Sequence, residues 1–357
     1  MSAGSTCASN RADESLTTMP RQIAFFLLRR LALTIPILLG VMLFAFVLVR
    51  LSGQEPVALL GGPTASVQQL EEIRQELGLD KSIPEQFAVY ASKVVRLDLG
   101  TSWLNNRPVL GDLLSRIPAT LELLLLGVGL GALVGIPTGL HAATHPNGRF
   151  DHLSRFLSLL GFSIPTYWLG LLTIFVFFYL LGWAPPPMGR ISLMVTPPPA
   201  ITGSYIIDAL LAADPEALSS AAGQLALPVL CLAIVAAAPI IKQTRAIALD
   251  VMSSDFVRYA RASGLPPRVM KRLVLRNSLV PLITFIGTEL AGLVGTSSLI
   301  ELVFAWGGAG QYGLSAIIQG DFVAVQGYVL YVTLASLLIF LVVDLAVILL
   351  EPRVQTL

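Results

Sequence analysis

Two acidic residues, Glu289 and Asp344, lie deep inside long apolar stretches of the sequence. An ionisable side chain in the middle of a bilayer costs about 2.5–3.5 kcal/mol on insertion scales, so such a residue usually has a use. The pattern fits a polar lining or gate on a solute path, and it equally fits a structural hydrogen bond between helices. Two further acids, Glu122 and Glu301, lie near the ends of apolar stretches, and we expect them to be hydrated.

Few other residues could perform chemistry on their own. His141, His145 and His152 lack the acidic residue of an H-E-x-x-H site, so a solvated or headgroup-level position is favoured over a metal site. The sequence contains no G-x-x-x-x-G-K-[ST] phosphate loop. We therefore predict no catalytic residue, no metal and no cofactor bound by this chain; if ATP drives it, partner subunits hold the ATP and its Mg²⁺.

The composition places the chain in a membrane. Hydrophobic residues make up 55% of it and charged residues 13%, with a mean hydropathy of +0.76, whereas roughly a quarter of the residues of soluble domains are charged. The net charge of +1 offers no general attraction for nucleic acid. A soluble globular protein and a nucleic-acid-binding protein are both excluded.

Six apolar runs are long enough to cross the hydrocarbon core, which takes about 20 helical residues. Only helices satisfy the backbone of such segments in lipid, so the fold class is an all-α membrane protein with six transmembrane helices. The runs cover residues 31–49, 120–141, 156–181, 225–241, 279–303 and 326–350. The predicted organisation is a disordered cytoplasmic tail (1–24), a first transmembrane helix (25–50), an external loop with short helices (51–118) and a five-helix core (119–354).

The basic residues predict the orientation. With the N-terminus inside, fifteen of the 23 Lys and Arg residues fall on the inner side and eight on the outer side, and seven of those eight lie in or beside the long loop 51–118. Because basic residues in short loops stay in the cytoplasm, both termini are predicted to be cytoplasmic.

Two stretches outside the membrane carry local signals. In the external loop, Ser66 and Gln69 fit a capping box and Gly78 a helix stop; this segment is interpreted as a packed cap or as part of a binding surface. Residues 183–222 contain two proline triplets, at 185–187 and 197–199, which favour extended chain.

Small residues recur at helical spacing in two of the runs. A side-chain-free helix face lets a second helix approach closely, so both runs are predicted to face other helices rather than lipid. The residues are Gly127, Gly131, Gly135 and Gly139 in the second run, and Gly287, Ala291 and Gly295 in the fifth.

The inner loop 242–278 is much longer than a connection requires. It favours a helix over residues 246–263, which Gly264 can end, and a second short helix beginning at Pro266 and Pro267. A basic inner loop is also expected from topology alone. The two alanines Ala260 and Ala262 and the break at Gly264 favour a rigid protrusion that inserts into a cleft of another protein.

At this loop the sequence resembles a known family. R-Y-A-R-A-S-G-L (258–265) followed by L-R-N-S-L-V-P (275–281) is similar to the coupling-loop signature of the inner-membrane permease subunits of bacterial ABC importers for dipeptides, oligopeptides and nickel, the dipeptide permease B-like components of binding-protein-dependent systems. The resemblance extends over about residues 25–354. The other matching segments are L-L-R-R-L (27–31), E-L-G-L-D (76–80), D-L-G-T-S (98–102), P-A-T-L-E-L (118–123), S-I-P-T-Y-W-L-G (163–170), E-L-V-F-A-W-G-G-A-G (301–310) and V-D-L ending in E-P-R (344–353).

The resemblance implies a type I ABC importer permease in the bacterial plasma (inner) membrane. Its implied partners are a second homologous permease subunit, two cytoplasmic ATPase subunits and an external solute-binding protein, besides the lipid bilayer. It assigns ATPase coupling to Arg258, Ala260, Arg261, Ala262, Gly264, Leu265, Arg276 and Asn277. It assigns the translocation path to spans two to five, for which we name Ser163, Pro165, Trp168 and Glu289.

The sequence departs from the family at three places. Residues 52–56 read S-G-Q-E-P where the family usually has P-G-D-P, Leu273 replaces a frequent histidine, and the spacing from Gly264 to Asn277 is one residue short. These departures affect the fit to the partner rather than the class.

Two other classes explain the sequence less well. A proton-coupled secondary transporter would use Glu289 and Asp344 as a relay, but the two halves of the sequence show no convincing repeat. An intramembrane hydrolase lacks both H-E-x-x-H and a Ser/His/Asp set. For the importer, peptides are the favoured solute, and nickel, glutathione and oligosaccharides remain alternatives.

Overall fold

The computed structural model describes residues 5–51, 66–76 and 81–350. Within these ranges the secondary structure is helical, apart from one isolated bridge between Thr101 and Pro108. The helices are α1 (Ser5–Leu51), α3 (Val67–Glu76), α4 (Ile83–Val95), α5 (Val109–Thr144), α6 (Arg149–Ser163), α7 (Thr166–Thr173), the π-helix η1 (Ile174–Leu180), α8 (Tyr205–Leu211), α9 (Pro215–Ser253), α10 (Asp255–Ala262), α11 (Pro267–Thr296), α12 (Ser298–Val303), α13 (Ala309–Gln319) and α14 (Phe322–Leu350).

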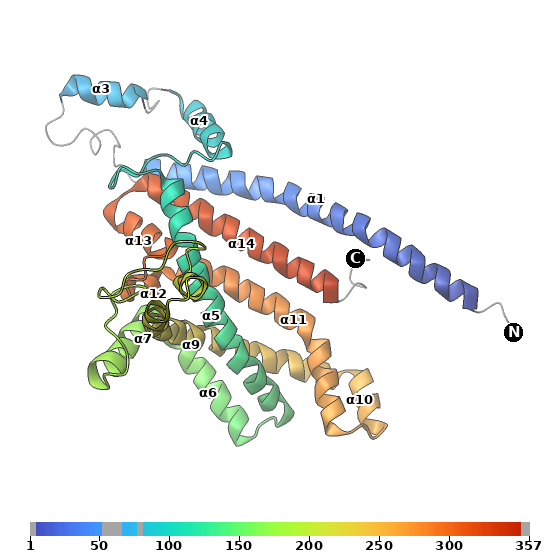
Figure 1. The fold of residues 1–357 in the computed structure, drawn as a ribbon. Coiled ribbons are helices and arrows are strands. Elements are labelled where there is room, and N and C mark those ends of the chain that lie inside the picture. The colour runs from blue at the N-terminus through green and yellow to red at the C-terminus, as the bar shows by residue number, and fades with distance from the viewer. Residues whose placement is uncertain (1–4, 52–65, 77–80, 351–357) are drawn as a thin grey trace.

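The long helices form one bundle (Figure 1). Helices α3 and α4 lie at one end of it, called here the α4 end, and α10 lies at the opposite end, called the α10 end. The chain-terminal ends of α1 and α14 point toward the same side as α10.

Within the described ranges, five single helices are long and apolar enough to cross a membrane, and a sixth crossing is possible through a bent pair of helices. The single helices are the apolar part of α1 (Leu28–Leu51) together with α5, α9, α11 and α14. The all-α architecture with up to six crossings agrees with the sequence prediction.

The third predicted span, 156–181, is not one helix. It is divided between α6 and α7–η1, which meet at 101°. The break lies at Ile164, whose backbone is extended, and Pro165, which cannot donate to a helical bond. The same Ile-Pro dipeptide stands inside α5 at Pro118 and at Pro137 without a break, so the proline alone does not decide. Helix α7 also packs on α12, where a Cβ on Gly170 would lie 3.1 Å from Val303.

Helices α5 and α9 make the central contact of the bundle. The glycine face predicted in the second run packs against α9, which confirms the prediction. A Cβ on Gly127 would lie 2.6 Å from Leu232, and one on Gly135 would lie 2.8 Å from Ile240. At Gly139 a Cβ would lie 2.7 Å from the backbone oxygen of Ile241. Any side chain at these positions would push the helices apart.

The second predicted small-residue face packs against α14. Gly287 leaves no room for a Cβ beside Val343, and the Ser336 hydroxyl reaches the Ala291 carbonyl at 3.4 Å. The prediction that both faces meet other helices is therefore confirmed.

Helix α1 begins at Ser5, so it extends back through most of the segment for which we predicted disorder. Propagating an existing helix costs little per residue, which lets a polar sequence continue an apolar helix.

In the external loop, Ser66 and Gln69 form the predicted capping box. The Ser66 N–H donates to the Gln69 side chain at 2.9 Å, and the Gln69 N–H donates to Ser66 Oγ at 3.3 Å. The expected stop at Gly78 lies outside the described residues.

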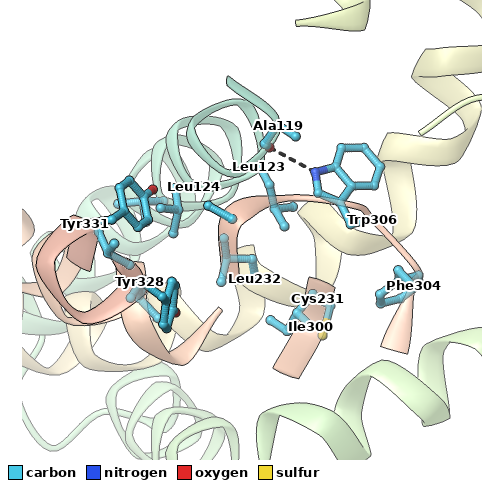
Figure 2. Close-up of a cluster of buried hydrophobic side chains, with 14 of the residues drawn as sticks. Ala119, Leu123, Leu124, Cys231, Leu232, Ile300, Phe304, Trp306, Tyr328 and Tyr331 are labelled. Carbon is cyan, nitrogen blue, oxygen red and sulfur yellow. Dashed lines mark hydrogen bonds between the residues drawn. The ribbon is translucent and has the colours of Figure 1, made fainter. Parts of the chain in front are cut away.

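The buried core joins residues far apart in the sequence. Leu123 and Leu124 of α5 pack with Cys231 and Leu232 of α9 and with Ile300 of α12 (Figure 2). The aromatic side chains of Phe304, Trp306, Tyr328 and Tyr331 surround this centre. The core thus fixes the α12–α13 region, which follows the fifth span, against the middle of the bundle.

Candidate functional site

The segment 254–267, called here the protruding segment, forms the turn of the chain at the α10 end (Figure 1). It begins at Ser254, whose extended backbone (φ −65°, ψ 150°) ends α9, and continues directly into α10. Gly264 has φ +75°, a left-handed conformation that favours glycine. Helix α11 then begins at Pro267, a position where the missing N–H of proline costs nothing.

Two details of this segment correct the sequence prediction. The helix expected over 246–263 is divided at Ser254, and the expected second short helix is the first part of α11, which continues for 30 residues through Pro281. Neighbouring helices can satisfy the backbone freed by a proline in a membrane, so Pro281 does not end the helix. The protruding segment is thereby joined to the spans α9 and α11 by very short connections.

Helix α10 has a buried face and an exposed face. Val257 is 0% exposed and Ala260 8% exposed, and both point into the protein. Arg258, Arg261 and Ala262 lie on the exposed face, and a Cβ on Gly264 would meet no atom within 4 Å. The side chains predicted to touch a partner are thus divided: Ala260 is buried against the protein, and Arg258, Arg261 and Ala262 are exposed at the surface.

The sequence analysis missed two aromatic residues on this face. Tyr259 is 77% exposed and Phe256 46% exposed. The signal was present, because both residues alternate with buried Val257 and Ala260 at helical spacing. Among the remaining predicted coupling residues, Leu265, Arg276 and Asn277 are exposed, and Asn277 donates to the Leu273 carbonyl at 2.7 Å.

Three of the four predicted path residues lie together at the break between α6 and α7. Ser163 donates to the Leu159 carbonyl at 2.8 Å at the end of α6, Pro165 begins α7, and Trp168 is 47% exposed. Glu289 lies half-buried on α11, and no hydrogen bond or ion pair joins it to the described part of the chain. The structure does not bring Glu289 to the α6–α7 break.

Asp344, the other acid expected in mid-membrane, pairs with Arg30 of α1 at 2.6 Å. The pair links α14 to α1. Of the two interpretations left open by the sequence, this contact favours the structural one for Asp344.

Glu301 is buried rather than hydrated as expected, since 0% of it is exposed. The Thr120 hydroxyl donates to its carboxylate at 2.8 Å, and the Gln311 N–H donates to it at 2.8 Å. Gly308 leaves room for it, because a Cβ there would lie 2.5 Å from a carboxylate oxygen. The Ala309 N–H donates to the same Thr120 hydroxyl at 2.9 Å. Thr120 and Gln311 thus bond one carboxylate oxygen each, which keeps the buried carboxylate hydrogen-bonded after the loss of water.

A second contact joins the same two stretches. The indole N–H of Trp306, which is 2% exposed, donates to the Ala119 carbonyl at 2.9 Å (Figure 2). The segments P-A-T-L-E-L (118–123) and E-L-V-F-A-W-G-G-A-G (301–310), noted separately in the sequence, are therefore one packed unit.

Glu122 is also buried, contrary to the expected hydration, with 7% of its side chain exposed. It pairs with Arg190 at 3.0 Å and accepts the Ser204 hydroxyl at 2.7 Å. The Arg190 guanidinium lies 3.9 Å from the ring centre of Tyr205 and reaches the Gly203 carbonyl at 2.8 Å. The proline-containing stretch 183–222 is thus anchored to Glu122 of α5 by Arg190 and by the Ser204 hydroxyl, contacts that sequence patterns did not identify.

Asp208 closes the turn that precedes α8. Burial acts to raise the pKa of its carboxyl group, but hydrogen bonds donated by Thr202 and Gly203 outweigh it and hold the pKa below the ordinary value. The carboxylate therefore fixes this turn in its charged form.

A buried ion pair lies toward the α10 end. Asp151 of α6 is 0% exposed and receives two bonds from Arg245 of α9, at 2.5 Å and 2.8 Å. The Asn147 N–H donates a third bond at 2.9 Å. The arrangement is a two-point clamp between α6 and the last turns of α9.

Comparison with known proteins gives the class of the molecule. Residues 135–356 match the family described as "Binding-protein-dependent transport system inner membrane component". Residues 23–124 match the N-terminal family of the same membrane components. The chain belongs to this family.

Three relatives cover nearly the whole permease. It is 40% identical over 316 residues to the "Probable D,D-dipeptide transport system permease protein DdpB" of Escherichia coli (strain K12), which covers 88% of this chain and 93% of that protein. It is 36% identical to the di/tripeptide transport system permease protein DppB of Pseudomonas aeruginosa (strain UCBPP-PA14), over 92% of this chain and 98% of the relative. It is 33% identical to the glutathione transport system permease protein GsiC of Escherichia coli O6:H1, again over 92% and 98%.

The permease is a multi-pass membrane protein: its described residues include several helices long and apolar enough to span a bilayer, and its family consists of inner-membrane components. The fully buried carboxylate of Glu301 lies in a segment that the sequence analysis used for the resemblance and otherwise expected to be hydrated. The buried pairs could not be found from spacing, because Thr120 and Glu301 are 181 residues apart.

Proposed function

We propose that the chain is the permease subunit of an ATP-driven importer and forms half of its translocation path. The observation that carries the proposal is the protruding segment, a rigid and exposed turn joined directly to two spans. The subunit lies in the bacterial inner membrane with both termini and α10 on the cytoplasmic side. Its family membership and the common side of the chain ends and α10 in Figure 1 support that orientation.

The protruding segment is suited to pass a force to the membrane helices. One residue, Ser254, separates α9 from α10, and residues 263–266 separate α10 from α11. A displacement of α10 therefore moves the ends of two spans rather than being absorbed by a loop. Arg258, Arg261 and Tyr259 offer charge and aromatic surface to a partner, and the space beside Gly264 lets that partner approach closely.

The partner at this surface is an ATPase subunit, and two of them serve the permease and a second homologous permease. Closure of the ATPases on ATP moves α10 and opens the path toward the outside, and hydrolysis resets it. ATP and Mg²⁺ are bound by those partners, and this chain has no catalytic residue. The family description, a binding-protein-dependent system, supports an external solute-binding protein as the source of solute.

The solute proposed is a dipeptide or a short oligopeptide. The names of the relatives in Escherichia coli and Pseudomonas aeruginosa support this class. Glutathione, itself a tripeptide, is the alternative that the GsiC relative favours. The path is formed by α5, the α6–α7 break, α9 and α11, with Glu289 as its acidic group. The pairing of Asp344 with Arg30 argues against a proton relay through both acids.

The experiment uses two glycines in matched surroundings. Gly264→Asp adds strain and negative charge at the α10 end, because a side chain disfavours the left-handed conformation. Gly182, with φ +63° and no atom within 4 Å of a Cβ, offers the same change after η1, where Gly182→Asp is the control. Both variants are expected in the membrane. Gly264→Asp should lose co-purification of the ATPase subunits and Gly182→Asp should keep it; retention by both variants would overturn the docking assignment.

A further inference from the structure

A cavity of about 800 Å³ lies at the α10 end, between the ends of α5, α9, α10 and α11. Ala248 and Val274 line it, and with Ala143 they form a small buried cluster separate from the main core. No residue of the Glu301 or Asp151 centres lines it. Neither these polar centres nor the proposed translocation path accounts for this cavity.

The lining of the cavity has two chemistries. One part is apolar, with side chains that include Leu140, Met252, Leu265, Met270 and Leu275. The other part carries three cations, Arg261, Lys271 and Arg272. None of these three makes an ion pair with an acidic side chain among the described residues. An occupant that satisfies both parts must have an apolar body and an anionic head.

Helix α11 supplies most of the cavity lining: one face of its first turns repeats along the cavity, and Arg272 joins the lining from the adjoining face. Pro267, Met270, Lys271, Val274 and Leu275 repeat at intervals of three and four and line the cavity together. Arg268 stands on the same first turns but does not line it. Part of the basic charge of this segment is thus directed into the cavity.

The depth of the cavity matches a bilayer boundary. On α5 its lining begins at Pro137, inside the apolar run that ends at His141, and on α11 it ends at Leu275, four residues before the next run begins. At 1.5 Å per residue, the backbones of Lys271 and Arg272 on α11 lie within about 12 Å of the apolar run that begins at 279. Headgroups fill about 5–7 Å on each side of the hydrocarbon, and the long side chains of Lys271 and Arg272 can extend toward that layer.

We infer that this cavity binds an anionic phospholipid, with the phosphate on Lys271, Arg272 and Arg261 and an acyl chain along the apolar lining. Basic pockets between membrane helices at this depth suit such headgroups. Because Arg261 and Leu265 belong to the protruding segment, the lipid would hold that segment against α5 and α11. The inference rests on the placement of the spans in a bilayer; it shares Arg261 and Leu265 with the proposed ATPase contact, whereas Lys271 and Arg272 belong to the cavity alone.

The test is lipid binding to the purified full-length chain in detergent, measured by native mass spectrometry. The probes are palmitoyl-oleoyl phosphatidylglycerol, palmitoyl-oleoyl phosphatidylcholine and free sn-glycerol 3-phosphate. We expect phosphatidylglycerol to bind, phosphatidylcholine to bind about tenfold more weakly or less, and glycerol phosphate neither to bind nor to compete. Competition by glycerol phosphate would identify a plain phosphate site and overturn the lipid assignment.

Variants separate a specific site from lipid held around the whole surface. Lys271→Gln with Arg272→Gln removes two cavity cations and should weaken phosphatidylglycerol binding by about tenfold or more, since hydrogen bonds to charged groups are the strong ones. Arg268→Gln, an exposed change on the same helix, should leave it unchanged. Equal losses in both would show surface lipid only. Loss of ATPase co-purification in the double variant with phosphatidylglycerol binding intact would assign the cavity to the ATPase instead, and either result contradicts the inference.

Discussion

Gly139 and Gly129 lie on the same helix and differ in what surrounds them. A Cβ on Gly139 would lie 2.7 Å from the Ile241 backbone oxygen and 2.7 Å from the Thr244 side chain, whereas a Cβ on Gly129 would meet no atom within 4 Å. Alanine at each position therefore isolates one variable, the closeness of α9. The expected effects on the free energy of unfolding have opposite signs.

The magnitudes follow from packing and helix propensity. Gly139→Ala forces an overpacked contact with backbone that cannot rotate away, which costs about 1–3 kcal/mol. Alanine gains about 0.5–1 kcal/mol over glycine inside a helix, so the net loss at position 139 centres on about 1 kcal/mol and reaches at most about 2.5 kcal/mol. At Gly129 only the gain remains, and the variant should be as stable as the parent protein or slightly more stable.

The buried thiol of Cys231 provides the assay. It lies on α9 with 0% exposure, so a thiol-reactive dye labels it only on unfolding. Thermal unfolding is followed in detergent, in a Cys7→Ser background. The midpoint temperature of Gly139→Ala should be lower than that of the parent protein, and the midpoint of Gly129→Ala should equal or exceed that of the parent. Equal shifts of both variants in the same direction would refute the close approach of α5 and α9.

Three further variants test the polar contacts. Thr120→Val should destabilise the protein by about 2 kcal/mol or more, because one carboxylate oxygen of Glu301 and the Ala309 N–H each lose a buried hydrogen bond, at about 1–3 kcal/mol each. Thr138→Val is the control, since the Thr138 hydroxyl bonds within its own helix; it should change thermal unfolding little, and equal effects of the two variants would contradict the network. Asp151→Asn breaks a buried ion pair and should lower the free energy of unfolding by about 3 kcal/mol or more. Asp255→Asn, at an exposed ion pair, should change it by no more than about 0.5 kcal/mol. Similar melting curves for both variants would contradict a stabilising role for the pair of Asp151 and Arg245. Glu289→Gln in the assembled transporter should change peptide-stimulated ATP hydrolysis while the subunits remain together, and unchanged transport would place Glu289 among structural residues.

The membrane class, the small-residue faces and the division near Gly264 could be predicted because each depends on neighbours in sequence. A run of apolar residues or a glycine every fourth position has a direct physical consequence wherever it lies. The capping box at Ser66 and Gln69 is of the same kind, since both partners lie within one helical turn.

The errors come from contacts between distant segments. Glu301 stands near the end of an apolar run, which predicts hydration, but Thr120 and the α13 backbone enclose it. Glu122 was misplaced for the same reason, because Arg190 returns to it from a loop 68 residues away. The α6–α7 break depends on packing against α12 as well as on Pro165, and the same dipeptide inside α5 has no such effect.

The energy source of uptake tests the central claim most directly. The permease would be reconstituted in liposomes with the proposed partners, which are a second permease, two ATPase subunits and a solute-binding protein, and with a labelled dipeptide. The account predicts accumulation against the gradient only when ATP is present on the α10 side, and none with an ion gradient alone. Sustained uphill uptake by this chain alone, driven by an ion gradient without ATP, would contradict it.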